Sequence, residues 1–270
     1  ARDLPVTETL LTVSGAVEHP VTRWVSVGTP ICEVLKLAGG PLADRPAVIK
    51  NGLMMGSLVE DLEEPVIKTT SGLIVLPEEH ELVRRYRTPP QAMARIGKSA
   101  CDQCSYCTEL CPRYLLGYDI QPHAVMRSLG FSASGSEIWN RYALLCCGCG
   151  ICTLYACPEA LYPREACLDG IRDLRAAGLA QIDRERPVKV HPMKEYRRVP
   201  MPALIRRLGV SRWEREAPFS PEIFEPPMVR VPLKQHAGVP ARPTVKPGDR
   251  VRKGQLIGEI PEGELGARVH

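Results

Sequence analysis

The chain has 270 residues, 44% of them apolar and 24% charged, and its 35 basic and 31 acidic residues give a net charge of +4. This length predicts two or three domains, and the near balance of charge excludes an acidic disordered tail and gives little support to nucleic acid as a partner. The chain has 26 prolines, which predict long connecting segments. It has eleven cysteines but only 3 Trp, 8 Tyr and 3 Phe, so we expect part of the chain to be held together by something other than aromatic packing.

Residues 9–80 alternate between apolar and polar side chains, as a small β-rich domain does. A helix with Pro30 at its first position and Thr29 as its N-cap is predicted to end at Gly39–Gly40. Asn51–Gly52 predicts a turn. Strands are predicted at about residues 10–17, 24–28, 47–49, 65–67 and 73–76. The order strand, strand, helix, strand, strand predicts a β-grasp domain, here given the range 1–85.

Nine of the cysteines lie between residues 101 and 157, in two runs of regular spacing. The first run has the spacing C-x2-C-x2-C-x3-C-P that is typical of bacterial ferredoxins. The second run has the same pattern, except that four residues rather than three precede its last cysteine, and it carries the extra thiol of Cys147. The first run is Cys101, Cys104, Cys107 and Cys111 before Pro112, and the second is Cys146, Cys149, Cys152 and Cys157 before Pro158.

This spacing predicts two [4Fe–4S] clusters, because a tight loop with a thiolate at every third residue can reach three iron corners of a cubane. In ferredoxins with two clusters, the last cysteine of each run binds the other cluster. We therefore expect Gly148 and Gly150 to let the backbone approach the inorganic sulfides. The expected ligands are Cys101, Cys104, Cys107 and Cys157 for cluster 1, and Cys146, Cys149, Cys152 and Cys111 for cluster 2.

Zinc is the alternative, since CxxC pairs also form zinc ribbons. A zinc site has no use for a third cysteine at the same spacing or for the proline that follows, so iron–sulfur clusters are favoured. Cys147, Cys167 and Cys32 are interpreted as spare or buried thiols, with Cys147 as a substitute ligand only if its loop shifts register. The scattered histidines, among them His123, are interpreted as structural rather than as metal ligands.

Helices are predicted over residues 122–145 and 164–178. Cluster loops set between helices indicate an α-helical ferredoxin domain, given the range 86–182. Residues 183–227 are basic and spaced by prolines, which predicts a solvated linker; a docking strip for an acidic redox partner is the alternative.

Residues 228–270 alternate again and contain the turn Pro247–Gly248–Asp249, which predicts part of a β barrel-sandwich hybrid. Lys253 does not lie between methionines, so covalent lipoate or biotin is not expected. The start at Ala1 and the single half of a hybrid suggest a fragment or a processed chain.

The sequence contains no run of 18 apolar residues, so a transmembrane helix is not predicted. It also contains no dinucleotide fingerprint, phosphate loop or catalytic triad, so no catalytic residues are predicted. The predicted fold class is an α+β multidomain protein.

The segments VSGAVEHP, VGTPICEVLKLAGG, NGLMMGS and PVIKTTSGLIVL resemble the SLBB domain of RnfC-like electron-transfer subunits. The double cysteine run and the segment from VPLKQHAGVPARP to the end also resemble that family. The hybrid follows the clusters here, which is similar to the cobalamin reductases of bacterial propanediol utilisation.

The resemblance implies an oxidoreductase that takes electrons from NADH through FMN and [4Fe–4S] clusters to the cobalt of cobalamin. It implies that the flavin and NADH module is N-terminal to the SLBB domain and has no counterpart in this sequence. It also implies Gly52, Met54, Met55 and Gly56 as corrinoid contacts, with core packing as the alternative for the two methionines. The implied partners are a corrinoid, a corrinoid-dependent enzyme or adenosyltransferase, and microcompartment proteins. The implied location is the cytoplasm or a bacterial microcompartment.

Two functions therefore compete. The first is the electron-transfer core of a cobalamin reductase, which reactivates a B12-dependent enzyme. The second is a non-catalytic RnfC-like relay or docking subunit of a larger redox complex, membrane-associated or soluble.

Overall fold

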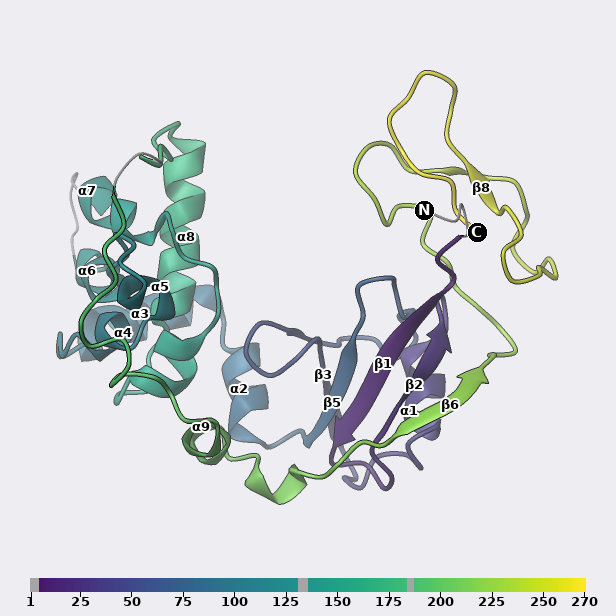
Figure 1. Ribbon diagram of the computed structural model, residues 1–270, viewed down its shortest axis with the longest axis horizontal. Coiled ribbons are helices and arrows are strands. Elements are labelled where there is room, and N and C mark those ends of the chain that lie inside the picture. Colours follow the sequence, from purple (N-terminus) through teal and green to yellow (C-terminus); the bar gives the residue numbers. More distant parts are fainter. Residues whose placement is uncertain (1–4, 131–135, 184–186) are drawn as a thin grey trace. The chain divides into compact units, whose positions relative to one another are not determined.

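The computed structural model describes residues 5–130, 136–183 and 187–270, and the chain divides into two compact units (Figure 1). Unit 1 combines Ala1–Val83 with Trp213–His270, and unit 2 is Arg84–Arg212. The strands of the described residues lie in unit 1, whereas the described part of unit 2 is helical, so the mixed α and β content matches the predicted class. Within the described ranges, none of the helices has the length and apolar character needed to cross a membrane.

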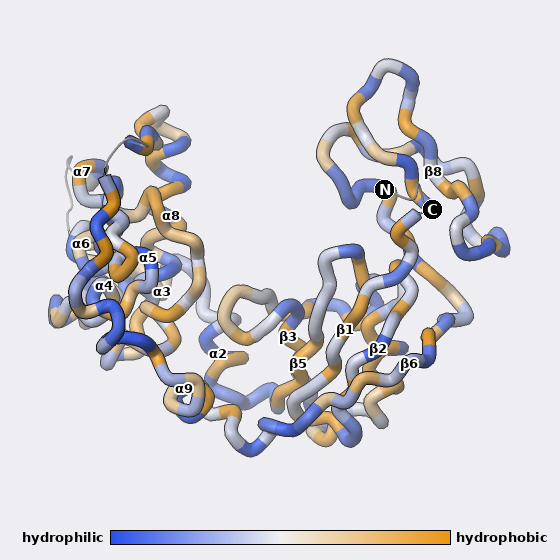
Figure 2. The backbone as a smooth tube through the Cα atoms, viewed as in Figure 1, coloured by the Kyte–Doolittle hydropathy of each residue, from blue (hydrophilic) through white to orange (hydrophobic). Residues whose placement is uncertain are grey.

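Unit 1 is built on a six-stranded sheet of order β4-β3-β5-β1-β2-β6. Its centre is the parallel pair of β1 and β5, and β2 runs antiparallel to β1 (Figure 1). Hydrophobic stretches recur along β1, β3 and β5 (Figure 2). The strands are β1 (Glu8–Gly15), β2 (Val21–Ser26), β3 (Pro46–Lys50), β4 (Ser57–Leu58), β5 (Gly72–Pro77) and β6 (Phe219–Phe224).

Four of the predicted strands are therefore confirmed, and the fifth is not. The segment 65–67 makes only an isolated bridge, between Pro30 and Pro65. Proline has no N–H to donate to a ladder, and both residues of this bridge are prolines, so the pairing does not extend into a strand.

Helix α1 (Ile31–Lys36) covers the sheet and supplies part of its core. Its apolar stripe of Ile31, Val34 and Leu35 is buried against Leu11 and other strand residues. The predicted capping by Thr29 differs from the structure: the N-cap is Pro30, and the buried Thr29 hydroxyl instead donates to the Ser26 carbonyl over 2.7 Å.

Residues 183–227, expected as a linker, contribute to both units. Helix α9 (Met201–Arg207) belongs to unit 2, whereas β6 extends the sheet of unit 1 by pairing in parallel with β2. Pro221 lies within β6, and most of the strand is exposed at the edge of the sheet, so the segment gave no strand signal.

The C-terminal residues form β7 (Arg242–Pro243) and β8 (Gly258–Glu259), an antiparallel pair with a small apolar core of its own. The core is formed by Ala241, Ile257 and Val269.

Unit 2 surrounds the cysteines with short helices. The helix predicted at 164–178 is confirmed as α8, followed by Gly178 at φ +71°. The helix predicted at 122–145 is instead α6 and α7 with a 3₁₀ turn at Arg141–Ala143; residues 131–135 lie outside the described residues. Helix α2 (Glu81–Arg87) begins in unit 1 and ends in unit 2. The helices within unit 2 before α9 are α3 (Pro90–Ala100), α4 (Tyr106–Glu109), α5 (Pro112–Leu115), α6 (Pro122–Ser128), α7 (Ser136–Asn140) and α8 (Pro163–Ala176).

We expect Gly15→Ala to destabilise unit 1 by about 3 kcal/mol or more, because the methyl group adds a clash to the strain of a left-handed backbone. Gly15 has φ +91°, and a Cβ there would lie 2.2 Å from the Val75 carbonyl oxygen in the central parallel pair. Gly40 is the matched control: its φ is +88°, but nothing lies within 4 Å of its Cβ position, so Gly40→Ala should cost about 1–2 kcal/mol. Hydrogen exchange of β1 and β5 measures both; equal effects would contradict the role of the close approach.

Candidate metal centres

The first group of cysteines lines one cavity of unit 2. Cys157, from the end of the second run, joins the first run there. The cavity walls also include Gln103, His123 and Met126. The four cysteines that share this cavity, here called site 1, are Cys101, Cys104, Cys107 and Cys157.

The second group lines a separate cavity, here called site 2. Cys111, from the end of the first run, meets the cysteines of the second run there. Arg113 and Ile120 also line this cavity. Its cysteines are Cys111, Cys146, Cys149 and Cys152, together with the extra thiol of Cys147. The chain thus exchanges the last cysteine of each run between two cavities, which is the grouping expected for crossed ligation.

The two cysteine loops repeat the same backbone conformation. In the first run, Gln103 and Ser105 have φ +64° and +69°, and in the second run Gly148 and Gly150, at equivalent places, have φ +68° and +80°. The carbonyl that opens the following helical turn accepts two backbone N–H groups in both runs, at Ser105 and at Gly150. The glycines predicted at this loop are therefore explained by left-handed backbone. A Cβ at Gly148 would meet only Leu168, at 3.9 Å.

The extra residue of the second run is absorbed by a π-helix. Cys107 lies within α4, whereas Cys152 begins a π-helical turn, Cys152–Ala156 (η2). A π-turn spans one residue more than an α-turn. The four residues between Cys152 and Cys157 therefore bring Cys157 to the position in its run that Cys111 reaches with three residues after Cys107. Both crossing cysteines have the same extended backbone, with φ and ψ of −68° and 120° at Cys111 and −75° and 117° at Cys157, and a proline follows each.

The donor set fits a cluster better than a single ion. Around tetrahedral zinc, four sulfurs at about 2.3 Å from the metal lie close together. In the described part of the chain, no three His, Cys, Asp or Glu side chains converge closely enough for one metal ion. Four cysteines spread around the wall of each cavity suit a larger group with several iron corners.

Burial controls the protonation of most of these thiols. It raises the pKa of Cys107 to about 12 and that of Cys149 to about 11, and it also raises the pKa of Cys152 well above the usual value. Iron binds thiolates rather than thiols, so loading these sites with clusters would release protons. Cys146 is the exception, because a hydrogen bond with Cys167 lowers its pKa to about 6 against the effect of burial.

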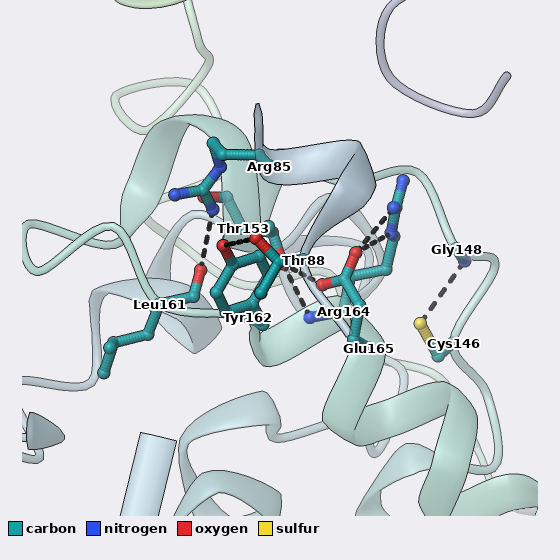
Figure 3. A network of polar contacts seen from close by, with 9 residues as sticks. All are labelled: Arg85, Thr88, Cys146, Gly148, Thr153, Leu161, Tyr162, Arg164 and Glu165. Carbon is teal, nitrogen blue, oxygen red and sulfur yellow. Dashed lines mark hydrogen bonds and ion pairs between the residues drawn. The ribbon is translucent and has the colours of Figure 1, made fainter. Parts of the chain in front are cut away.

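Arg85 holds the segment that carries Cys157, a role that the sequence did not indicate. Its Nη2 donates to the carbonyls of Thr153 and Leu161 over 3.1 and 3.0 Å (Figure 3). Its Nη1 donates to the Ala160 carbonyl. Its guanidinium lies 4.7 Å from the ring centroid of Tyr162. These partners lie about seventy residues from Arg85 in the chain, so no local pattern could reveal them.

Two further contacts fix the same region. Arg207 on α9 donates from Nη2 to the Cys157 carbonyl over 2.9 Å. The Thr153 hydroxyl donates to Glu165 Oε2 over 2.8 Å and accepts from the Arg164 backbone N–H over 2.8 Å, which joins the π-helix to the first turn of α8 (Figure 3). His123 shares a 2.8 Å hydrogen bond between its Nδ1 and the Thr108 hydroxyl, and burial lowers its pKa.

The spare thiols and the predicted corrinoid contacts lie as follows. Cys167 is buried, Cys147 is exposed, and Cys32 is partly exposed in unit 1, with its Sγ 3.1 Å from Glu63 Oε1. The loop Asn51–Gly56 is also in unit 1, and a Cβ at Gly56 would lie 1.9 Å from the Lys50 carbonyl oxygen, so the loop itself requires this glycine. Met55 is 65% exposed, so the alternative interpretation of this side chain as a core residue is wrong.

Comparisons with known proteins agree with these sites. Residues 100–162 match the family model of a 4Fe-4S dicluster domain, and residues 220–270 match that of the RnfC barrel sandwich hybrid domain, which starts earlier than the predicted residue 228. Unit 2 is thus an iron–sulfur domain, and the predicted hybrid is confirmed.

Over 267 residues, the chain is 39% identical to cobalamin reductase PduS of Salmonella typhimurium and 38% identical to that of Citrobacter freundii. These matches cover 98% of this chain but 58% of each relative, so the chain spans a little over half of their length. A subunit of the ion-translocating oxidoreductase complex of Methanosarcina acetivorans is 37% identical over 112 residues, which are 42% of this chain and 22% of that protein. The predicted resemblance is confirmed.

If ligation is crossed, Cys157→Ser will affect the same cluster as Cys104→Ser, and Cys111→Ser the same cluster as Cys149→Ser, because a serine hydroxyl is a poorer ligand for iron than a thiolate. Electron paramagnetic resonance of the dithionite-reduced variants should therefore sort the four into these two pairs. Cys32→Ser is the control and should retain both signals. Pairing of Cys157→Ser with Cys149→Ser would refute crossed ligation.

Arg85→Met should destabilise unit 2 by about 3 kcal/mol, because three carbonyls lose a charged donor while the aliphatic stem is kept. Iron should then be lost to a chelator faster than from the unchanged chain. Arg95→Met on the next helix, α3, is the control, since Arg95 is exposed and its substitution should not destabilise the unit. Equal rates of iron loss from the two variants would show that the Arg85 contacts do not stabilise the site.

Proposed function

This chain resembles the cobalamin reductase PduS over 98% of its length, and from that premise we propose that it is the iron–sulfur core of such an enzyme. It passes single electrons through two [4Fe–4S] clusters towards the cobalt of a corrinoid, and so reactivates a B12-dependent enzyme. The observation that carries the proposal is the pair of cavities, each lined by four of the eight predicted ligands.

The eight thiolates hold the clusters, cluster 1 in site 1 and cluster 2 in site 2. When bound, each cluster accepts and gives up one electron. Backbone donors stabilise two of the sulfurs: the Leu161 N–H donates to Cys157 Sγ, and the Gly148 N–H donates to Cys146 Sγ, each over 3.3 Å. Such hydrogen bonds tune the potential of the metal group.

The crossed arrangement also supports transfer between the sites. Cys107 and Cys111 lie four positions apart in one short segment but belong to different cavities, and Cys152 and Cys157 repeat this across the π-helix. Two short peptide segments thus tie the sites together.

Unit 1 is assigned to the β-grasp class of SLBB domains. This is supported by the parallel pairing of β1 with β5 and by the position of α1 after the first hairpin. The loop with Gly52, Met54, Met55 and Gly56 is kept as the candidate corrinoid contact, supported by the exposure of Met55.

The cofactors and partners of the whole enzyme belong to the same proposal. FMN and NADH are assigned to parts of the enzyme outside this sequence, cobalamin is the substrate, and a corrinoid-dependent enzyme or adenosyltransferase is the partner. The proposed location is the cytoplasm or a bacterial microcompartment. These assignments are supported by the similarity to PduS.

A relay subunit is the second candidate. The similarity to a subunit of ion-translocating oxidoreductase complexes favours it, since that match covers 42% of this chain. In this case unit 1 and the hybrid would serve as docking surfaces, and no corrinoid would accept electrons from the chain.

Aquacobalamin should oxidise the reduced chain in a saturable manner. The chain is reduced anaerobically with dithionite, the reductant is removed, and aquacobalamin is added while cluster and corrin absorbance are followed together. We expect cob(II)alamin to appear in step with about two electrons per chain, one per cluster. A Cys104→Ser variant should deliver about half as many. Clusters that reduce but are not oxidised by corrinoid would favour the relay.

A further inference from the structure

A strongly basic segment, residues 187–207, lies in unit 2 after α8. We call it the basic strip. It contains six basic residues and one acidic residue, Glu195, although the whole chain is nearly balanced in charge. The six basic residues are Lys189, Lys194, Arg197, Arg198, Arg206 and Arg207.

The first part of the basic strip is packed on α5, the helix that follows the crossing cysteine of site 2. The His191 N–H donates to the Leu115 carbonyl over 3.0 Å, and the ring centroids of His191 and Tyr114 are 5.2 Å apart. Gly117, with φ +97°, follows α5, and a Cβ there would lie 2.1 Å from the Lys189 carbonyl oxygen. The strip therefore lies against the helix instead of extending into solvent as a free linker.

The second part contacts the segments of both sites. Arg197 Nη2 lies 3.1 Å from Glu109 Oε2, and Glu109 is on α4 between a cysteine of site 1 and the crossing cysteine of site 2. Arg207, at the end of the strip, donates to the Cys157 carbonyl. A protein bound to the strip would therefore sit beside the peptide segments that join the two sites.

The basic strip keeps an excess of positive charge at its surface. Lys194 and Arg198 share the single carboxylate of Glu195. Lys189 and Arg206 are exposed, and neither forms an ion pair within the described part of the chain. These two cations are available to a partner with negative charge.

Exposed apolar side chains lie among the charges of the strip. Tyr196 is 81% exposed and Met201 is 64% exposed, and Val188 and Val190 are both about half exposed. Aromatic residues and methionine are enriched where one protein binds another, within a polar rim. This mixture favours a protein as the partner over a nucleic acid, which would be held chiefly by the cations.

We propose that the basic strip is the docking surface for an acidic electron-carrier protein that gives single electrons to the clusters. Charge complementarity selects this partner, because opposite charges steer the encounter and fix the orientation of the complex. In the transfer, the reduced carrier loses one electron and an oxidised cluster gains it, and no proton or bond is exchanged. The inference rests on the proposed function only in requiring the clusters, since no corrinoid takes part.

The test uses flavodoxin, an acidic protein with one FMN, as the probe. Binding of oxidised flavodoxin to the cluster-loaded chain is measured at about 0.01 M and about 0.1 M salt, between which the Debye length falls from about 30 to about 10 Å. We expect the affinity to fall about tenfold or more over this range. At the higher salt, the double variant Lys189→Glu, Arg206→Glu should bind about fivefold more weakly or worse, with its iron content unchanged.

Matched controls separate the strip from net charge and from general surface apolarity. Arg95→Glu with Arg175→Glu makes the same change in charge at exposed positions on α3 and α8, and should alter the affinity by less than about twofold at the higher salt. Tyr196→Ser should weaken binding about fivefold and leave its salt dependence unchanged. Ile138→Ser, at an exposed apolar residue of α7, should have no effect.

Electron transfer is followed with flavodoxin that has been reduced by dithionite and freed of the reductant. Below saturation, the rate at which the clusters are reduced should fall in the Lys189→Glu, Arg206→Glu variant by the same factor as the affinity. The inference is overturned if this variant and the Arg95→Glu, Arg175→Glu control weaken binding equally, or if salt has no effect. It is also overturned if a single-stranded RNA oligonucleotide binds the strip more tightly than flavodoxin does. Retained flavodoxin binding and cluster reduction without any corrinoid reduction would support this inference and count against the proposed function.

Discussion

Burial of cysteine sulfur is the constraint on which unit 2 depends. Cys107, Cys111, Cys152 and Cys157 are all buried, in a unit whose described helices have at most 14 residues. A thiolate at such a place is costly without a cation, which is why burial raises the pKa of Cys107 to about 12. In the proposed sites iron would remove that cost by binding the thiolate, and metal binding would then be coupled to the folding of this unit. Isolated helices this short are marginal in water, and the clusters would provide the cross-links that hold them.

The contacts around Cys157 show how the rest of the unit serves the same constraint. Arg85, Arg207 and Thr153 come from three separate segments, and each binds the backbone or the helix that carries this cysteine. These contacts fix the backbone on both sides of Cys157. Arginine suits this role, because its planar guanidinium can satisfy several carbonyls at once.

The repeated loops make the differences between the sites informative. Equivalent residues share left-handed backbone, equivalent carbonyls accept the same pair of N–H groups, and both crossing cysteines have extended backbone. Against this common frame, Arg113 in the wall of site 2 and Asp102 in the wall of site 1 are differences in charge. In unit 1, the loop that was predicted as a corrinoid contact carries an exposed Met55.

The sequence by itself determined the features that are local in the chain. The spacing of the cysteines and the prolines after them identified the iron–sulfur domain, and period-two alternation located β1, β2, β3 and β5, because these patterns follow from the reach of a loop and the pleat of a strand. Tertiary structure decided the rest. The π-helix that aligns Cys157, the pairing of β6 with a strand nearly two hundred residues away, the donors Arg85 and Arg207, and the placement of Cys167 against Cys146 all join distant segments. Their energies arise only when the packed chain removes these groups from water, and no periodicity in the sequence records that.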